Sequence, residues 1–450
     1  MMNIILSKPN LDVSVIRLEP GDEKHTAALD RLPKRTYQVV YEPQNTMAVR
    51  SEMLRRAADE VCQLMRSDKV TEASLLAEGL SQTEVLAFLE GLTLADYSFD
   101  RFKSKTPQHI KQLVVDENLV SPVALEEQQR VWNRVFWCRE WVNLPVANLN
   151  ADQFAEELAS IANDLHVACT VFDKKKIESL RMGGLLAVNK GSVDEPRFVV
   201  LEYNPKQQSD TPIVLVGKGI MYDTGGLNLK PDDYMQEMKS DMAGAATMAS
   251  VIFSAADNNL PVHLVACLPL TDSRPGFNAY AADDIITMYD GTTVEVVNTD
   301  AEGRIILADA IAYAVSKYNP SLIIDAATLT GAAVRAISTF GIAAMQQNAS
   351  THMDGLKRIG EEVYERIAEF PFWNEYDSLI KSEVADLKNC GIAQAGTITA
   401  GKFLAHFAKQ TPYIHLDIAG VAFFSKKQDY YAAGASGYGI RLLYNFLKTL

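Results

Sequence analysis

The sequence contains no apolar run that is long enough to cross a membrane. No hydrophobic stretch in the 450 residues approaches the roughly 20 residues that a transmembrane helix requires. The start of the chain also lacks the basic leader and the long apolar core of a secretory signal. We therefore expect a cytoplasmic protein that has no membrane partner.

Paired cysteines and several common catalytic motifs are also absent. The five cysteines are widely spaced and never form a CxxC pair, which is typical of free thiols in a reducing compartment. The P-loop pattern GxxxxGK[ST], the dinucleotide fingerprint GxGxxG and the HExxH helix of zincin proteases do not occur. These absences disfavour a P-loop nucleotidase, a Rossmann dehydrogenase and a mononuclear zincin.

Basic residues are the minority among the charged residues. The 43 Lys and Arg against 57 Asp and Glu give a net charge of -14, which disfavours nucleic acid and anionic membranes as partners. The hydrophobic content of 48% and the charged content of 22% are typical of a globular protein with a sizeable core. A chain of this length favours two domains.

The pattern of strands and helices predicts an α/β protein in two parts. Residues 1–120 alternate strand-like and helix-like runs and predict a small N-terminal α/β domain. Residues 121–150 predict a long connecting helix and a linker. Residues 151–450 predict a larger α/β/α domain with a mixed, largely parallel sheet. Its expected elements include strands at 198–202, 212–216, 263–268, 293–297, 322–326 and 413–418, and helices at 152–163, 235–256 and from 305.

The heptapeptide NTDAEGR, residues 298–304, lies between an expected strand and an expected helix. Asp300 and Glu302 can present hard oxygen ligands there, Arg304 offers a fork of donors, and Gly303 leaves room for a close approach. The same residues also suit an ordinary helix start, with an N-cap aspartate and a glutamate in the first turn. Taken alone, the heptapeptide supports both interpretations equally.

A second cluster of charged residues occupies a glycine-rich loop after the expected strand at 212–216. The strand ends near Lys218, the loop carries Asp223 and Lys230, and Asp241 follows at the start of a helical run. Glycine-rich loops of this kind often bind phosphate through backbone N–H groups. Asp223 would repel a phosphate unless a cation lay between them.

The two clusters together contain four carboxylates, which balance the charge of two divalent cations. These carboxylates are Asp223, Asp241, Asp300 and Glu302. Such a set suits a dinuclear site that polarises one water. One of the two nearby lysines could lose its proton and become a nitrogen ligand, while the other could stay protonated and stabilise an oxyanion.

These residues resemble the leucyl aminopeptidase family, the cytosolic dinuclear metallo-exopeptidases. The family heptapeptide NTDAEGR is unaltered here, the pattern VGKG-x-x-x-D-[ST]-G-G-x-x-x-K-P runs through 216–231, and Asp241 lies in the DM-x-GAA context. Agreement continues at 327–332, 398–401 and 415–420, and is faint before about residue 140. The chain departs from the family at 188–192, where VNKGS replaces the usual VGQGS, and at Ala422, where some members have a larger residue.

The resemblance implies a metal-dependent aminopeptidase that removes N-terminal residues from peptides through a metal-bridging hydroxide, with a broad preference for Leu- or Met-like side chains. Two divalent ions per subunit are implied, Zn²⁺ and/or Mn²⁺, with Mg²⁺ or Co²⁺ as alternatives. The tighter ion would be held by Lys218, Asp223, Asp241 and Glu302. The more exchangeable ion would be held by Asp223, Asp300 and Glu302.

The resemblance also implies roles around the metals. Lys230 would bind the scissile carbonyl and its oxyanion, and Arg304 would hold a bicarbonate that acts as general base. The substrate-binding residues would be Met238, Thr328, Leu329 and Gly331. The family's usual assembly is a homohexamer, so we expect one here.

Two other functions remain as alternatives. A two-metal phosphoesterase would predict histidine ligands, but neither cluster contains a histidine. A non-catalytic hexameric scaffold or DNA-binding protein on the same fold would predict lost metal ligands or a basic face, whereas every expected ligand is present and the chain is acidic.

Overall fold

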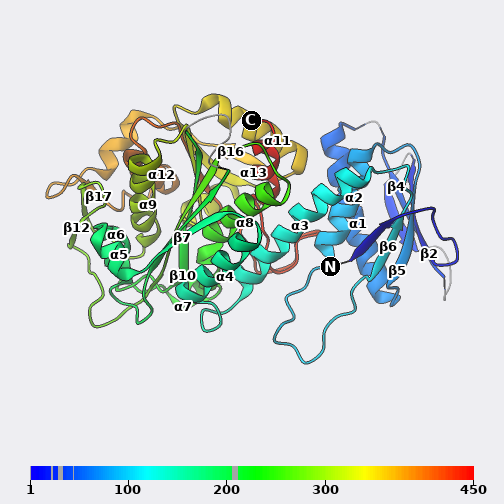
Figure 1. Cartoon of the computed structure of the whole chain (residues 1–450), viewed down its shortest axis with the longest axis horizontal. Coiled ribbons are helices and arrows are strands. Elements are labelled where there is room, and N and C mark those ends of the chain that lie inside the picture. Colours follow the sequence, from blue (N-terminus) through cyan, green and yellow to red (C-terminus); the bar gives the residue numbers. More distant parts are fainter. Residues whose placement is uncertain (1, 22–23, 29–33, 44, 205–210) are drawn as a thin grey trace. The chain divides into compact units, whose positions relative to one another are not determined.

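Figure 1 shows the computed structural model of the chain, which describes residues 2–21, 24–28, 34–43, 45–204 and 211–450. Its packing forms two units. Unit 1 contains residues 1–136, 361–364 and 424–436, and unit 2 contains 137–360, 365–423 and 437–450. The division falls inside helix α3 (Pro122–Asn143). The boundaries at 120 and 150 stay a prediction.

Unit 1 is built on a six-stranded sheet in the order β1-β6-β5-β2-β4-β3. All of its described strand pairs are parallel except β3 with β4. The strands are β1 (Asn3–Leu6), β2 (Ser14–Pro20), β3 (His25–Ala28), β4 (Thr36–Tyr41), β5 (Glu72–Ala77) and β6 (Gln112–Val115). Helices α1 (Met47–Ser67) and α2 (Gln82–Ala95) connect the parallel strands, as the alternating pattern predicted.

Unit 2 is built on a nine-stranded sheet in the order β16-β15-β18-β14-β9-β11-β8-β7, with β10 paired to β11. The central strands β18, β14, β9 and β11 run parallel to one another. β8 pairs antiparallel with both β11 and β7, and β15 pairs antiparallel with β18 and parallel with β16. This is the mixed, largely parallel sheet that the sequence predicted. The strands are β7 (Ala168–Phe172), β8 (Arg197–Tyr203), β9 (Ile213–Gly217), β10 (Gly219–Asp223), β11 (Leu264–Ser273), β14 (Leu322–Ala327), β15 (Ile342–Gln347), β16 (Ile367–Glu369) and β18 (Tyr413–Asp417).

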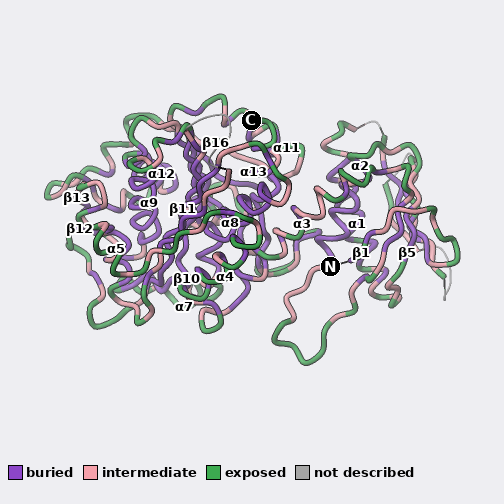
Figure 2. The backbone as a smooth tube through the Cα atoms, viewed as in Figure 1, coloured by how far each residue is buried: buried purple, intermediate pink, exposed green. Residues whose placement is uncertain are grey.

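Helices cover both faces of this sheet, with α9 and α12 on one face and α8 and α13 on the other (Figure 1). Figure 2 shows that the sheet and the helices against it are the most deeply buried part of unit 2, and all ten residues of β11 are buried. Burial on both faces explains why these strands are continuous apolar runs. The helices are α4 (Ala151–Asp164), α5 (Lys174–Ser179), α6 (Gly183–Asn189), α7 (Asp232–Met235), α8 (Ala243–Asp257), α9 (Glu302–Tyr318), α10 (Gly331–Ile337), α11 (Ser350–Val363), α12 (Gly396–Ala408) and α13 (Ile440–Leu447).

Two expectations about local structure differ from what is observed. The strand expected at 293–297 is β13 (Thr293–Glu295), which joins a small sheet with β12 (Ile285–Thr287) and β17 (Leu387–Lys388) instead of the main sheet. The helix expected at 235–256 is divided into α7, a 3-10 turn at Met238–Met242 and α8. Glu237 has a φ of 68° in the left-handed region, which no continuous right-handed helix can contain.

The remaining elements are short. They are the 3-10 helix Asn374–Ile380 and the strands β19 (Phe423–Phe424) and β20 (Gly434–Ala435). Among the described residues, no helix combines the length and the apolar character that spanning a bilayer would need.

Candidate metal centre

The charged residues of the two sequence clusters meet at the carboxyl ends of parallel strands in unit 2, where α/β sheets usually bind their ligands. Lys218 follows β9, and Asp223 is the last residue of β10. Asp241 lies in the 3-10 turn before α8, Asp300 precedes α9, and Glu302 is the first residue of α9. The N-cap position of α9 is Ala301, so the capping interpretation of Asp300 is wrong.

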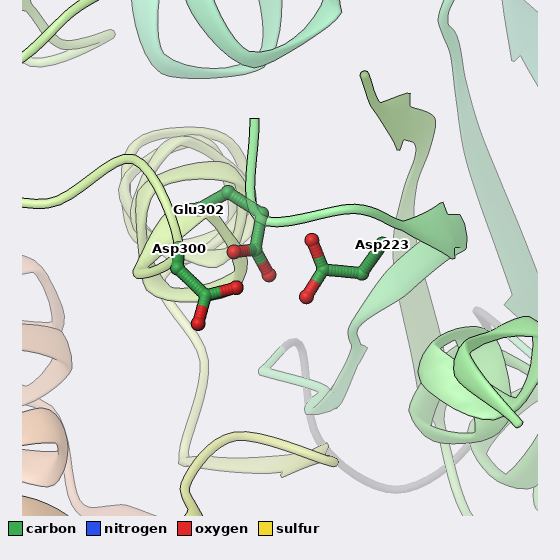
Figure 3. Close-up of side chains that lie close together, drawn as sticks. All are labelled: Asp223, Asp300 and Glu302. Carbon is green, nitrogen blue, oxygen red and sulfur yellow. The ribbon is translucent and has the colours of Figure 1, made fainter. Parts of the chain in front are cut away.

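Three of the carboxylates point toward one another, as Figure 3 shows. Asp223, Asp300 and Glu302 each offer an oxygen, and these atoms all lie within 4.8 Å of one another. Asp223 and Glu302 are buried, whereas Asp300 is partly exposed. This is the spacing that one or two hard cations need for shared carboxylate ligands.

Lys218 lies on the buried side of the cluster. Its Nζ is 2.8 Å from Asp241 Oδ1 and 3.0 Å from Glu302 Oε1, and it donates to the carbonyl oxygen of Thr328 at 2.9 Å. The side chain passes directly over Gly303, where a Cβ would come within 2.3 Å of the Lys218 Cε. The expected close approach at Gly303 is therefore confirmed, and the group that approaches is this lysine.

Lys230 lies on the more exposed side of the same carboxylates. Its Nζ is 2.8 Å from Asp223 Oδ2 and 2.6 Å from Asp300 Oδ1. Gly225, in the loop that carries it, has a φ of +82°, and a Cβ there would lie 2.8 Å from Asp300 Oδ1. The glycine-rich loop thus serves a close approach to a carboxylate, not the phosphate site that such loops often form.

Negative charge is in excess at this site, because four carboxylates face two ammonium groups. Burial, reinforced by Glu302 and Asp241, raises the pKa of Asp223 well above its usual value. Burial also raises the pKa of Asp241 to about 6 although Lys218 opposes it. At Glu302 burial is outweighed by Lys218 and Lys230, which lower the pKa of this carboxyl.

The arrangement leaves polar atoms available for a cation. Glu302 is 2% exposed, and its Oε2 has no hydrogen-bond partner among the described residues. A buried charged oxygen without a partner is costly, and a divalent ion would satisfy it. The carboxylate oxygens and the lysine nitrogen are a donor set that suits Zn²⁺, Mn²⁺ or Mg²⁺, so these residues fit a metal site.

A cavity of about 400 Å³ opens beside Asp300, which is the one of the four carboxylates that lines it. Arg304 lines it, is 6% exposed, and has an Nε without a hydrogen-bond partner among the described residues. Burial lowers the pKa of this guanidinium, although the Cys390 thiol and Glu302 oppose the shift. A buried guanidinium that faces a cavity is suited to bind a small anion.

The four expected substrate-binding residues are not all in this cavity. Leu329 and Gly331 line it, whereas Thr328 and Met238 are not among its lining residues. Thr328 instead donates through its hydroxyl to Asp241 Oδ1 at 2.7 Å. Met238 is half-buried at the start of the 3-10 turn.

Sequence reasoning assigned no role to Cys390 or Asp417. Cys390 lines the cavity, and Asp417 contacts the loop that forms one wall of it. For Cys390 no signal in the sequence was available. For Asp417 the signal is the stretch 415–420, which agrees with the family pattern.

Known proteins are similar to this chain in sequence and in fold. A model of the cytosol aminopeptidase family, catalytic domain, matches residues 136–444. A probable cytosol aminopeptidase of Geobacter sulfurreducens is 40% identical in an alignment over 419 residues, and the match covers 90% of this chain and 83% of that protein. One of Chlorobaculum tepidum is 44% identical in an alignment over 381 residues, and the match covers 81% of this chain and 75% of that protein.

Among solved structures, the bottromycin maturation enzyme BotP in complex with Mn matches with a TM-score of 0.87. It is 28% identical and the match covers 97% of this chain and 99% of BotP. The fold, the carboxylate site and these matches define a metal-dependent aminopeptidase. The chain belongs to the cytosol aminopeptidase family, and none of the matches supports the non-catalytic alternative.

Proposed function

We propose that the chain is a dinuclear metallo-aminopeptidase that removes N-terminal residues, preferably Leu- or Met-like ones, from peptides. The observation that carries this proposal is the convergence of Asp223, Asp300 and Glu302, with a buried Glu302 oxygen that no described group satisfies. The set of possible metal ligands contains no histidine, which argues against the phosphoesterase alternative.

The positions of the ligands support two unequal metal sites. Lys218, Asp223, Asp241 and Glu302 would hold the tighter ion, because all four are at most 4% exposed. Asp223, Asp300 and Glu302 would hold the exchangeable one, since Asp300 has a side chain that is 33% exposed. Zn²⁺ and Mn²⁺ are our first candidates, with Mg²⁺ and Co²⁺ next, and the similar BotP structure is a complex with Mn.

Lys218 must change its protonation state to serve as a ligand. Burial lowers its pKa, but Asp241 and Glu302 outweigh burial and raise it, so the lysine is an ammonium in this arrangement. Divalent ions would neutralise the carboxylates and favour the neutral amine. Metal loading should therefore release a proton from Lys218.

Bound divalent ions would supply Lewis-acid polarisation of the scissile carbonyl and an activated water. The residues of the chain then have separate tasks. Lys230, held between Asp223 and Asp300, would donate to the oxyanion that develops on that carbonyl. Arg304 would hold a bicarbonate in the cavity, and this bicarbonate would act as the general base that accepts a proton.

Residues of the cavity wall would contact the peptide substrate. Leu329 and Gly331 would contact the peptide from the cavity wall. Thr328 and Met238, which do not line this cavity, would be further substrate-binding residues. An apolar pocket distinguishes side chains by only about 1–3 kcal/mol per methylene, so the specificity should be broad. We also propose a cytoplasmic homohexamer.

The test is cleavage of a leucyl anilide by the purified protein after chelation and after addition of each metal. An N-acetylated leucyl anilide serves as the matched control. We expect cleavage of the free substrate only, and only with metal restored. Equal cleavage of the acetylated substrate would contradict an aminopeptidase mechanism, because the α-amine would not be a recognition element.

A further inference from the structure

We propose that Asp417 is a positioning residue of the peptide-binding cleft, whose carboxylate holds the loop 328–331 in the shape that substrate contacts require. The inference rests on the proposed function, because it concerns the same cleft. It assigns a task to a buried charge that neither binds the metals nor lines the cavity.

Asp417 lies directly behind this loop. It is the last residue of β18, and it is paired in register with Ala327, the last residue of the neighbouring parallel strand β14. The loop begins at the next residue, Thr328. The Asp417 side chain is 1% exposed, and Asp417 is not among the residues that line the cavity.

The Asp417 carboxylate accepts hydrogen bonds from three separate segments of the chain. Its Oδ1 accepts from the backbone N–H groups of Leu329 at 3.2 Å, Thr330 at 3.4 Å and Ala419 at 3.2 Å. Its Oδ2 accepts from the hydroxyls of Thr330 at 2.7 Å and Thr397 at 3.1 Å. One carboxylate therefore joins the loop, the start of α12 and the turn after β18.

The contact with Thr330 also orients α10. The Thr330 Oγ1 accepts from the backbone N–H of Ala333 at 3.0 Å and so caps this helix. Its own proton points to Asp417 Oδ2. A carboxylate that only accepts hydrogen bonds fixes the direction of that proton, and with it the start of the helix at Gly331.

The other end of the loop is tied to the metal centre. The Thr328 carbonyl oxygen accepts from Lys218 Nζ, and the Thr328 hydroxyl donates to Asp241 Oδ1. Leu329, whose N–H donates to Asp417, and Gly331, which follows Thr330, line the cavity next to Arg304. The loop is thus held at Thr328 by the proposed metal ligands and at Leu329 and Thr330 by Asp417. Asp417 therefore determines the orientation of the loop residues that line the cavity.

The substitution Asp417→Asn is a sharp test of this task, because it keeps the shape and changes one acceptor into a donor. If the new amide nitrogen took the Oδ1 position, it would face three backbone N–H donors. If it took the Oδ2 position, the hydroxyls of Thr330 and Thr397 would have to rotate and accept from it, and their own protons would lose the carboxylate acceptor. The first orientation displaces the loop, and the second weakens its attachment.

The matched control is Asp309→Asn, which changes another buried carboxylate in unit 2. Asp309 is 1% exposed and accepts from the backbone N–H groups of Leu185 at 2.9 Å and Tyr289 at 2.8 Å. It does not line the cavity and does not contact the loop. Asp309→Asn therefore disturbs the hydrogen bonds of a buried carboxylate, as Asp417→Asn does, at a residue that does not position the cavity wall.

The experiment compares wild type, Asp417→Asn and Asp309→Asn as full chains loaded with the metal that best supports wild-type cleavage of a leucyl anilide and a short peptide. Metal content, KM and kcat are measured for each. For Asp417→Asn we expect wild-type metal content, a raised KM and a fall in kcat/KM of about 10- to 100-fold. Asp309→Asn should lower the thermal midpoint and leave KM unchanged.

Three outcomes would overturn the inference. They are a wild-type KM in Asp417→Asn, a loss of metal equal to the loss of activity, or the same change of KM in Asp309→Asn. If Asp417→Asn does not fold, Thr397→Val, which removes one donor, should raise KM by a smaller factor, and an unchanged KM there would contradict the inference. A wild type without turnover would refute the proposed function and this inference together, whereas an active wild type with unaffected variants refutes only the inference.

Discussion

The two units of this protein each bury a cluster of charged side chains, and the two clusters are built differently. In unit 1, both carboxylate oxygens of Glu90 are engaged, Oε1 by Arg55 Nε at 2.6 Å and Oε2 by Trp132 Nε1 at 3.1 Å. In unit 2, Glu302 is equally buried, yet its Oε2 has no partner among the described residues.

This difference separates a structural ion pair from a site that awaits a ligand. Arg55 and Glu90 join α1 to α2 with complementary charge and hydrogen bonds, as buried pairs require. The unit 2 cluster instead places four carboxylates against two lysines and raises the pKa of Asp223 and Asp241. Excess charge of one sign inside a protein is costly, and such sites are usually functional.

The largest effect is expected for Glu302→Ala. The variant removes a ligand that both proposed metal sites share, so several kcal/mol of Lewis-acid stabilisation are lost and kcat/KM should fall by about 1000-fold or more. Because the substitution also relieves crowding of charge, the thermal midpoint of the metal-free protein should change little. The comparison needs kinetics of the metal-treated protein and calorimetry after chelation. Retained turnover would refute the shared role.

Lys230→Met should come next in size. Without its ammonium the oxyanion loses a donor, and kcat should fall by about 100- to 1000-fold while metal is still bound. Lys402→Met is the control, since Lys402 is 7% exposed and pairs with Asp377 at 3.2 Å outside the cavity. Steady-state kinetics measures kcat of each variant, and elemental analysis measures its metal content. Equal losses of kcat in both variants would point to a general effect of removing a buried lysine.

Glu90→Gln tests the other side of the comparison. It removes the closer of the two carboxylates with which Arg55 pairs, Glu90 at 2.6 Å against Glu52 at 3.6 Å, which should destabilise unit 1 by about 3 kcal/mol. Activity per folded molecule should stay at the wild-type level. Urea unfolding and kinetics at low temperature give the two quantities. A variant of wild-type stability but low activity would reverse the roles that we assign to the two clusters.

The smallest effect is the pH dependence of metal binding. Metals bind the ionised carboxylates, and the pKa of Asp241 is raised to about 6, so protons should compete with metal as the pH falls through that value. Apparent affinity should therefore rise by about tenfold per pH unit up to about pH 6, where Asp241 becomes ionised. Above that pH Asp241 no longer contributes, and any further rise comes from protons displaced at other ligands such as Lys218. Calorimetric titration from about pH 5 to about pH 8 measures the effect. An affinity that does not vary with pH would contradict it.

The sequence predicted those parts of the site that depend on local order. Asp300, Glu302 and Gly303 lie on one turn into α9. Lys218 and Asp223 lie at the carboxyl ends of β9 and β10, which both pair in parallel with β11, so the convergence of these two follows from the rules of parallel sheets. Asp417 was not assigned a role, because its partners Leu329 and Thr330 are 88 and 87 residues away along the chain.

Long-range pairing also explains the misplaced elements of the fold. Thr293–Glu295 has the residues of a strand, but its partners Ile285–Thr287 and Leu387–Lys388 decide that it belongs to a separate sheet. The segment 424–436 belongs to unit 1, where Lys427 pairs with Asp59 and Tyr430 bonds Glu52. No local sequence pattern in residues 424–436 indicates that this segment packs in unit 1.

The central claim is that the unsatisfied carboxylates of unit 2 form a site for two divalent cations. The most direct measurement is the number of Zn²⁺ or Mn²⁺ ions bound per chain, by elemental analysis after dialysis and by calorimetric titration. We predict two ions in the wild type and one in Asp300→Asn, which alters only the proposed exchangeable site. A wild type that binds one ion or none, or an Asp300→Asn variant that keeps two with unchanged affinity, would contradict the claim.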